Sequence, residues 1–218
     1  MAQLYVRSHG IHDVATHRGR ADCGEACAHA AAAAKSGRGR AYVQQVAQEP
    51  RRVVSSAIRF FKESRAYFNL TNESKHPIAY KGCIYPTAQH AFQALKFLPK
   101  YPDLAEHIRR CSSTDQARRE TKRYRNHIRA DWFSTHRGKL VHIAKMEEIL
   151  SLKFQQHPDL CEELASTSGS ELIYDNPSDA FWGVGPDNKG RNEFGRALMR
   201  LRKHVLEQAQ ATQRKRRG

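Results

Sequence analysis

Apolar residues recur at helical spacing through the second half of the chain, and this periodicity constrains the fold most strongly. Between residues 138 and 156, apolar side chains stand three or four positions apart and so share one face of a helix. The same criterion predicts further helices at residues 103–110, 114–127 and 159–165, and a last helix from about residue 192 past Val205.

Strand signals are short and come before the predicted helices. Residues 58–61 are typical of a strand, and two apolar runs within residues 77–85 flank Lys81-Gly82 as in a small hairpin. Thr87, just after a proline, predicts the N-cap of the first helix. The sequence therefore predicts one α+β domain over residues 57–208, mainly α-helical, with a few short strands near its start.

The first 56 residues differ from the rest in composition. They contain a run of alanines at 30–34, several arginines and few large apolar side chains. Such a segment cannot bury enough apolar surface to offset the entropy of ordering it. We therefore expect residues 1–56 to be a disordered, basic N-terminal extension.

The cysteines and histidines show no ligand spacing typical of a metal site. Five cysteines are scattered along the chain, and Cys23, Cys27 and His29 lack a second pair of ligands at zinc-finger spacing. We expect free thiols, no metal and no cofactor.

The chain carries a formal net charge of +15, which favours polyanionic partners such as nucleic acid or phosphorylated small molecules. Residues 209–218 form a basic tail ending in Arg214-Lys215-Arg216-Arg217-Gly218, which fits a nucleic-acid contact, a nuclear address or a solvated tail. No apolar run approaches the ~20 residues of a membrane span, and no signal-peptide pattern opens the chain. We expect an intracellular, cytoplasmic protein without membrane contact, the tail leaving a nuclear location open.

The helix that follows Thr87 has two different faces. Its apolar residues fall together, while polar side chains lie on the opposite side, which predicts an amphipathic helix with a solvated face. The apolar residues are Ala91, Ala94, Leu95 and Leu98, and the polar ones are Gln89, Gln93 and Lys96.

A glycine-rich loop, residues 182–192, opens into the last helix. It matches neither the dinucleotide fingerprint nor a P-loop. Its glycines would let backbone approach a ligand, a helix N-terminus can hold phosphate, and Trp182 offers an aromatic face. The alternative is an ordinary turn with Trp182 in the core.

Five segments, in this order, resemble those of the YbiA-like, or NADAR, family, over about 150 residues. They are Tyr67–Asn72, Tyr85–Phe97, Ala130–Trp132, Leu152–Leu160 and Asp179–Met199. The resemblance implies a YbiA-like fold and a hydrolase of N-glycosidic bonds. The bond joins a nitrogen base to a ribose that carries phosphate or ADP-ribose, as in riboflavin-pathway intermediates or ADP-ribosylated guanine.

The resemblance also implies roles for individual residues. A site that breaks such a bond must stabilise or trap a cationic sugar carbon, guide water and support the leaving nitrogen. The candidates for catalysis are Lys96, Asp179, Gln89 and His90. The candidates for substrate binding are Asn72, Gln93, Trp132, Trp182, Gly183, Gly185 and Asn192. Lys96 would either pair with phosphate or act as an amine nucleophile.

The chain departs from the family pattern at three positions. Relatives usually have glutamate where Gln89 and Tyr174 stand, and an aromatic residue where Glu73 stands. A carboxamide holds water but cannot accept its proton. Either Lys96 and Asp179 suffice, or His90 replaces the base, or the chain is a catalytically weakened module that binds ADP-ribose or nucleotides without efficient turnover.

Overall fold

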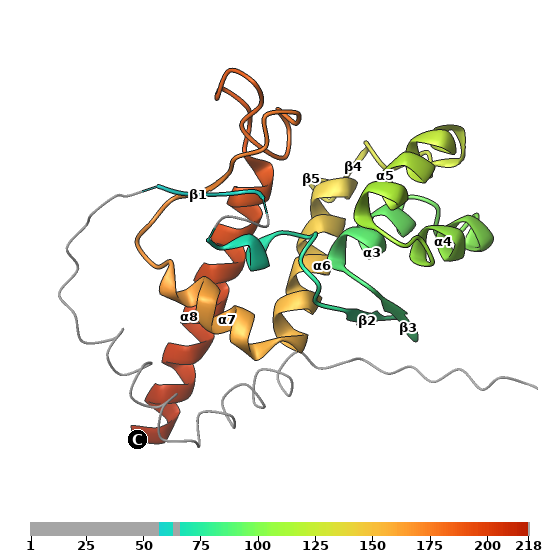
Figure 1. Ribbon diagram of the computed structural model, residues 1–218. Coiled ribbons are helices and arrows are strands. Elements are labelled where there is room, and N and C mark those ends of the chain that lie inside the picture. The colour runs from blue at the N-terminus through green and yellow to red at the C-terminus, as the bar shows by residue number, and fades with distance from the viewer. Residues whose placement is uncertain (1–56, 63–65, 218) are drawn as a thin grey trace, which may run out of the picture.

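The computed structural model describes residues 57–62 and 66–217. The expected N-terminal extension, with Cys23, Cys27 and His29, lies outside these residues. The chain forms an α+β domain dominated by helices, as predicted (Figure 1). In chain order its elements are β1 (Ile58–Phe60), η1 (Phe68–Leu70), β2 (Ile78–Tyr80), β3 (Cys83–Tyr85), α3 (Ala88–Ala94), α4 (Pro102–Arg109), α5 (Thr114–Arg123), η2 (Arg125–His127), β4 (Thr135–His136), β5 (Lys139–Leu140), α6 (Val141–Gln156), α7 (Pro158–Ser166), β6 (Leu172–Tyr174) and α8 (Glu193–Arg217).

Helix α6 lies between two groups of helices (Figure 1). It packs against α7 and the long helix α8 on one side and against α3 on the other, and α3 in turn contacts α4 and α5. The apolar stripe predicted for α6 explains this position, because Met146, Ile149, Leu150 and Phe154 are all buried.

The strands form three separate two-stranded sheets. The predicted hairpin pairs β2 with β3 antiparallel, with Ile78 opposite Tyr85. Strand β1 pairs in parallel with β6, so that Phe60 lies beside Tyr174 although the two are far apart in the sequence. Strands β4, β5 and β6 lie in the second half of the chain, beyond the start of the domain where strands were expected.

Two predicted helices are shorter than expected. The helix expected over residues 114–127 ends as α5 at Arg123, and a short 3₁₀ turn follows it. The helix expected from residue 138 begins only at Val141, because Arg137 and Gly138 form the turn between β4 and β5 with φ of 51° and 77°. Helix α8, by contrast, continues through the basic residues 209–217 without a break.

Helix α3 begins as predicted, since the Thr87 side chain accepts a hydrogen bond from the backbone N–H of His90. The solvated face that we expected is wrong. All seven residues of α3 are buried, including Gln89 and Gln93. Periodicity describes the helix alone, whereas α4, α5, α6 and the β2–β3 hairpin all contact it. No helix within the described ranges combines the length and apolar content of a membrane span.

Candidate active site around Lys96

Lys96 lies in a turn just past the end of α3, and its backbone N–H donates to the carbonyl of Gln93. Its ammonium nitrogen lies 5.5 Å from the centre of the Phe92 ring and 5.9 Å from that of Trp132. It makes no hydrogen bond or ion pair with any described residue. Burial, reinforced by the charge of Arg118 and opposed by that of Asp179, lowers the pKa of Lys96 to about 8.

Aromatic side chains surround this amine. The Phe92 ring packs against Trp132 at 5.4 Å and edge-on against Trp182 at 5.6 Å between centroids. Trp132 is 2% exposed and belongs to the core, whereas Trp182 is only partly buried. Of the two tryptophans predicted to bind substrate, Trp182 alone is therefore accessible to a base or sugar.

Asp179 shapes the loop that carries Trp182. Its Oδ1 accepts the backbone N–H groups of Phe181 at 2.9 Å and of Trp182 at 2.8 Å. Its charge also raises the pKa of Lys96, against the stronger effect of burial. The structure thus brings together Lys96 and Asp179, two of the residues predicted for catalysis.

The glycines and the asparagine of the closing loop make structural contacts. A Cβ at Gly183 would lie 2.7 Å from the Tyr174 carbonyl oxygen, and one at Gly185 would lie 2.9 Å from the Cβ of Ala180. The Asn192 amide is buried against strand β6, where it accepts from Tyr174 N–H at 2.9 Å and donates to the Leu172 carbonyl at 2.8 Å. Close packing of the chain therefore accounts for glycine or asparagine at these three positions. The contacts give no support to the ligand contacts that were predicted for them.

Asn72 and Gln93 each bury a side-chain oxygen without a partner. Oδ1 of Asn72 and Oε1 of Gln93 are inaccessible and accept no hydrogen bond within the described part of the chain. An unpaired buried acceptor costs ~1–3 kcal/mol, so such groups call for an explanation. Both residues were predicted to bind substrate.

Gln89 and His90 differ in how their side chains are used. The backbone N–H of Gln89 donates to the Asn72 carbonyl at 2.8 Å, while its side-chain amide makes no hydrogen bond to a described residue. His90 engages both ring nitrogens, with Nδ1 2.9 Å from the Thr87 hydroxyl and Nε2 3.1 Å from the Cys111 carbonyl. Nε2 must donate to that carbonyl, and burial lowers the pKa of His90. The neutral ring therefore has no free nitrogen for the predicted role of base.

Lys153 fixes the loop that carries Asn72, a role that we did not predict. It is fully buried on α6, and its ammonium donates to the carbonyl oxygens of Asn69 and Thr71 and to the Ser74 hydroxyl. Burial lowers the pKa of Lys153 to about 7, against the opposing charges of Glu163 and Asp159. Only the ammonium form can donate to all three oxygen acceptors. The only signal in the sequence was the position of Lys153 within one of the family-like segments.

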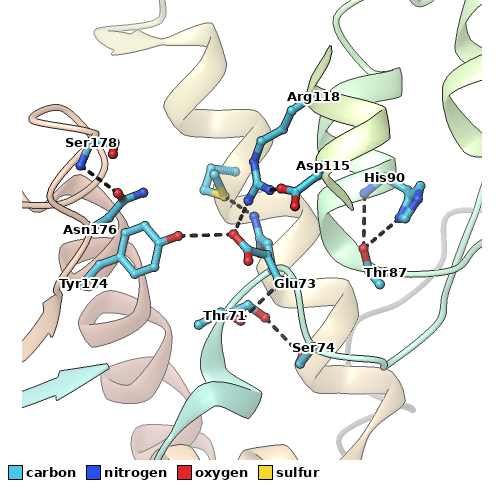
Figure 2. A network of polar contacts seen from close by, with 12 residues as sticks. Thr71, Glu73, Ser74, Thr87, His90, Asp115, Arg118, Tyr174, Asn176 and Ser178 are labelled. Atoms are coloured by element: carbon cyan, nitrogen blue, oxygen red, sulfur yellow. Dashed lines mark hydrogen bonds and ion pairs between the residues drawn. The ribbon is translucent and has the colours of Figure 1, made fainter. Parts of the chain in front are cut away.

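Arg118 and Glu73 complete the polar side of the site, and neither was predicted to belong to it. The Arg118 guanidinium pairs with the carboxylates of Glu73 and Asp115, and the Tyr174 hydroxyl lies 3.5 Å from Oε1 of Glu73. Figure 2 shows the Glu73 carboxylate between Tyr174 and Arg118. Arg118 is one of several cations along α5, and no sequence pattern distinguishes it from the others.

A family model described as the NADAR domain matches residues 55–206. The chain belongs to the NADAR family. The resemblance carried by the five sequence segments is thereby confirmed.

Named relatives agree with this membership. The chain is 36% identical over 149 residues to N-glycosidase YbiA of Escherichia coli strain K12, which is 68% of this chain and 88% of that protein. It is 32% identical over 165 residues to the chloroplastic riboflavin biosynthesis protein PYRR of Zea mays, or 70% of this chain and 26% of that protein. The NMR structure of E. coli YbiA matches with a TM-score of 0.62 at 34% identity, covering 71% of this chain and 88% of that chain.

This NADAR domain groups its polar residues around one amine. The charges of Arg118 and Asp179 act on both the Lys96 amine and the Tyr174 phenol, and the charge of Glu73 acts on Tyr174. Across the described ranges, His, Cys, Asp and Glu side chains do not gather in threes that could hold a metal ion.

Proposed function

We propose that this NADAR protein is an N-glycosidase. It hydrolyses the bond between a nitrogen base and a ribose that carries phosphate or ADP-ribose. Relatives named as an N-glycosidase and as a riboflavin biosynthesis protein support the reaction class and one kind of substrate. ADP-ribosylated guanine is the second kind, implied by the family resemblance.

The observation that carries this proposal is the state of Lys96. An ordinary surface lysine is almost fully protonated at neutral pH, but a pKa of about 8 leaves roughly one tenth of the Lys96 side chains as free amine at pH 7. Aromatic rings, and no paired carboxylate, surround the nitrogen. A desolvated, unpaired amine is suited to nucleophilic attack.

The reaction proceeds in two displacements at C1 of the ribose, first by the Lys96 amine and then by water. The lone pair of Lys96 Nζ forms a bond to C1 of the ribose as the bond from C1 to the base nitrogen breaks. The base leaves with the bonding electrons and takes up the proton that the amine loses. Water then displaces the amine at C1, which gives the free sugar and returns a proton to Lys96.

Three further candidate residues support a ribose ligand in this mechanism. The unpaired oxygens of Asn72 and Gln93 need hydrogen-bond donors, and ribose hydroxyls can supply them once these side chains turn toward the ligand. The partly exposed Trp182 offers a face on which a base can stack.

The test is release of free base and sugar product from each candidate substrate, measured by chromatography with the parent protein and two variants. Lys96→Met removes both charge and nucleophile, whereas Lys96→Arg keeps the charge alone. The proposal expects both variants to lose at least ~10²-fold in kcat. Activity retained by Lys96→Arg would show that Lys96 holds phosphate instead.

A second candidate function rests on Gln89. Its side-chain amide is buried on α3, where the family resemblance implies a glutamate, and an amide cannot accept a proton from water. On this reading the domain binds ADP-ribose or a nucleotide without efficient turnover. Calorimetric titration with ADP-ribose separates the two, since binding heat with no product from either substrate favours the binding module.

A further inference from the structure

Hydrogen bonds in the loop after η1 fix the position of Glu73. Its backbone N–H donates to the Thr71 hydroxyl at 3.3 Å. Lys153 holds the residues on both sides of it, at 2.6 Å from the Thr71 carbonyl and 2.6 Å from the Ser74 hydroxyl. A loop side chain with anchored neighbours is positioned rather than free to swing.

The carboxylate is enclosed but still reachable. The Glu73 side chain is 22% exposed, and its partner Arg118 is 35% exposed. Burial, with the charge of Glu73 adding to it, raises the pKa of Tyr174, so its hydroxyl stays protonated and can donate toward the carboxylate. Arg118 and Tyr174 thus hold one end of Glu73 from two sides (Figure 2).

Arg118 links Glu73 to the surroundings of Lys96, because it pairs with the Glu73 carboxylate. Arg118 is close enough to lower the pKa of Lys96, and Asp179 is close enough to raise it. Asp179 is tied to its own loop through two backbone N–H groups on Oδ1, and Gln89 is neutral. Glu73 therefore adds a second carboxylate to this group of charges, joined to it through its ion pair with Arg118.

The two neighbours Glu73 and Tyr174 are also two of the positions at which the sequence departs from the family pattern. That pattern has an aromatic residue at the first position and glutamate at the second. In this chain the carboxylate comes from the loop, at Glu73, and the phenol from β6, at Tyr174, which is the reverse of that pattern.

We propose that Glu73 supplies a carboxylate to the glycosidase site, held there by Arg118 and Tyr174, and counters the positive charge that develops on the sugar as the bond to the base breaks. The proposal rests on the proposed N-glycosidase function. It adds no proton transfer, because the carboxylate acts through its charge. It also gives the site a negative group without one at residue 89.

Three variants test this role with whichever of the two substrate kinds the parent protein hydrolyses. Glu73→Gln keeps the shape and removes the charge. Asp115→Asn is the matched control, because it removes the exposed carboxylate on the other side of Arg118. The exchange variant Glu73→Tyr with Tyr174→Glu returns the carboxylate to the site from strand β6. Thermal unfolding checks that each variant is folded.

Glu73→Gln is expected to lower kcat by about 10²-fold with KM changed less than about threefold, because the charge acts in the transition state. Asp115→Asn should retain parental kcat, and the exchange variant should recover to within about tenfold of the parent. Recovery in the exchange variant would show that the site needs a negative charge, and not only the ion pair between Glu73 and Arg118. The control, Asp115→Asn, leaves that ion pair intact.

The inference is overturned if Glu73→Gln keeps kcat within about threefold of the parent, or if a folded exchange variant stays as slow as Glu73→Gln. Should Glu73→Gln fail to fold, the exchange variant, which keeps the pair, decides alone. A parent without turnover on either substrate overturns the proposed function and this inference together. An active parent with an indifferent Glu73→Gln variant overturns this inference only.

Discussion

The ammonium nitrogen of Lys153, on α6, lies 2.6 Å from the carbonyl oxygen of Thr71, in the loop that carries Asn72 and Glu73. The side chain is completely buried, and its other two protons go to the Asn69 carbonyl and the Ser74 hydroxyl. One buried ammonium group therefore fixes the conformation of a loop that forms no helix or strand.

Replacing Lys153 with methionine should destabilise the protein. The change leaves two carbonyl oxygens and a hydroxyl buried without their donor, and each unpaired group costs ~1–3 kcal/mol. We expect the free energy of unfolding, measured with urea, to fall by at least ~2 kcal/mol. Lys203→Met, at a lysine whose side chain is 78% exposed, is the control and should change it by less than ~0.5 kcal/mol.

The pH dependence of the proposed reaction should follow the Lys96 amine. The pKa of Lys96 is lowered to about 8, and the reactive form is the unprotonated one, so kcat should rise as pH increases through 8 and level off above it. Stopped assays between pH 6 and pH 10 measure this profile. A kcat that falls through the same range would mean that the ammonium form is needed and would contradict the nucleophilic role.

A carboxylate at residue 89 should accelerate the reaction. Gln89→Glu is nearly isosteric and adds a group that can take a proton from water, a contribution worth ~10²-fold or more when well placed. The rise should be seen in kcat and should vanish when Lys96→Met is added. An unchanged or lower rate in the single variant would show that residue 89 does not address the attacking water.

Gly183→Ala should disturb the loop that carries Trp182 and Asp179. The new Cβ would stand 2.7 Å from the Tyr174 carbonyl and 3.0 Å from that of Asp179, and both contacts are with backbone that cannot easily move. We expect a loss of ~1–3 kcal/mol in unfolding free energy together with lower activity. Ser178→Ala, at an exposed residue of the same loop, should leave both unchanged.

We expect the basic end of α8 to contribute to nucleic-acid binding. Removing residues 209–218 deletes four cations, Arg214, Lys215, Arg216 and Arg217. The dependence of log K for single-stranded RNA on log salt should then become shallower by about 3. Fluorescence anisotropy at several salt concentrations measures it, and an identical slope for both proteins would exclude a role for these residues.

Local features of the fold were predictable from the sequence. The Thr87 cap, the β2–β3 hairpin and most helix positions follow from short-range rules, and each is present. The solvated face of α3 was a wrong prediction because burial depends on elements that lie elsewhere in the sequence. The parallel pairing of β1 with β6 is equally non-local, so no short stretch of sequence contains it.

The residues of the candidate site likewise divide into those that short sequence segments predict and those that depend on distant contacts. Lys96 and Asp179 were predicted because they lie in segments that resemble a known family, and the structure brings them close enough to interact. Arg118 and Lys153 were not, because their roles come from contacts with a distant loop, at Glu73 and Thr71. His90 fits the sequence pattern of a catalytic group, yet its ring is used to hold α3 in place.

The pairing of β1 with β6 has a consequence for synthesis on the ribosome. The ribosome makes the loop with Asn72 and Glu73 long before Tyr174, its partner across the site, and β1 has no strand beside it until β6 emerges. The amine and its surrounding charges therefore cannot assemble during translation until nearly the whole domain has left the exit tunnel. A chain that stops before β6 carries Lys96 but lacks Tyr174 and Asp179, so the candidate site is incomplete in every such truncated product.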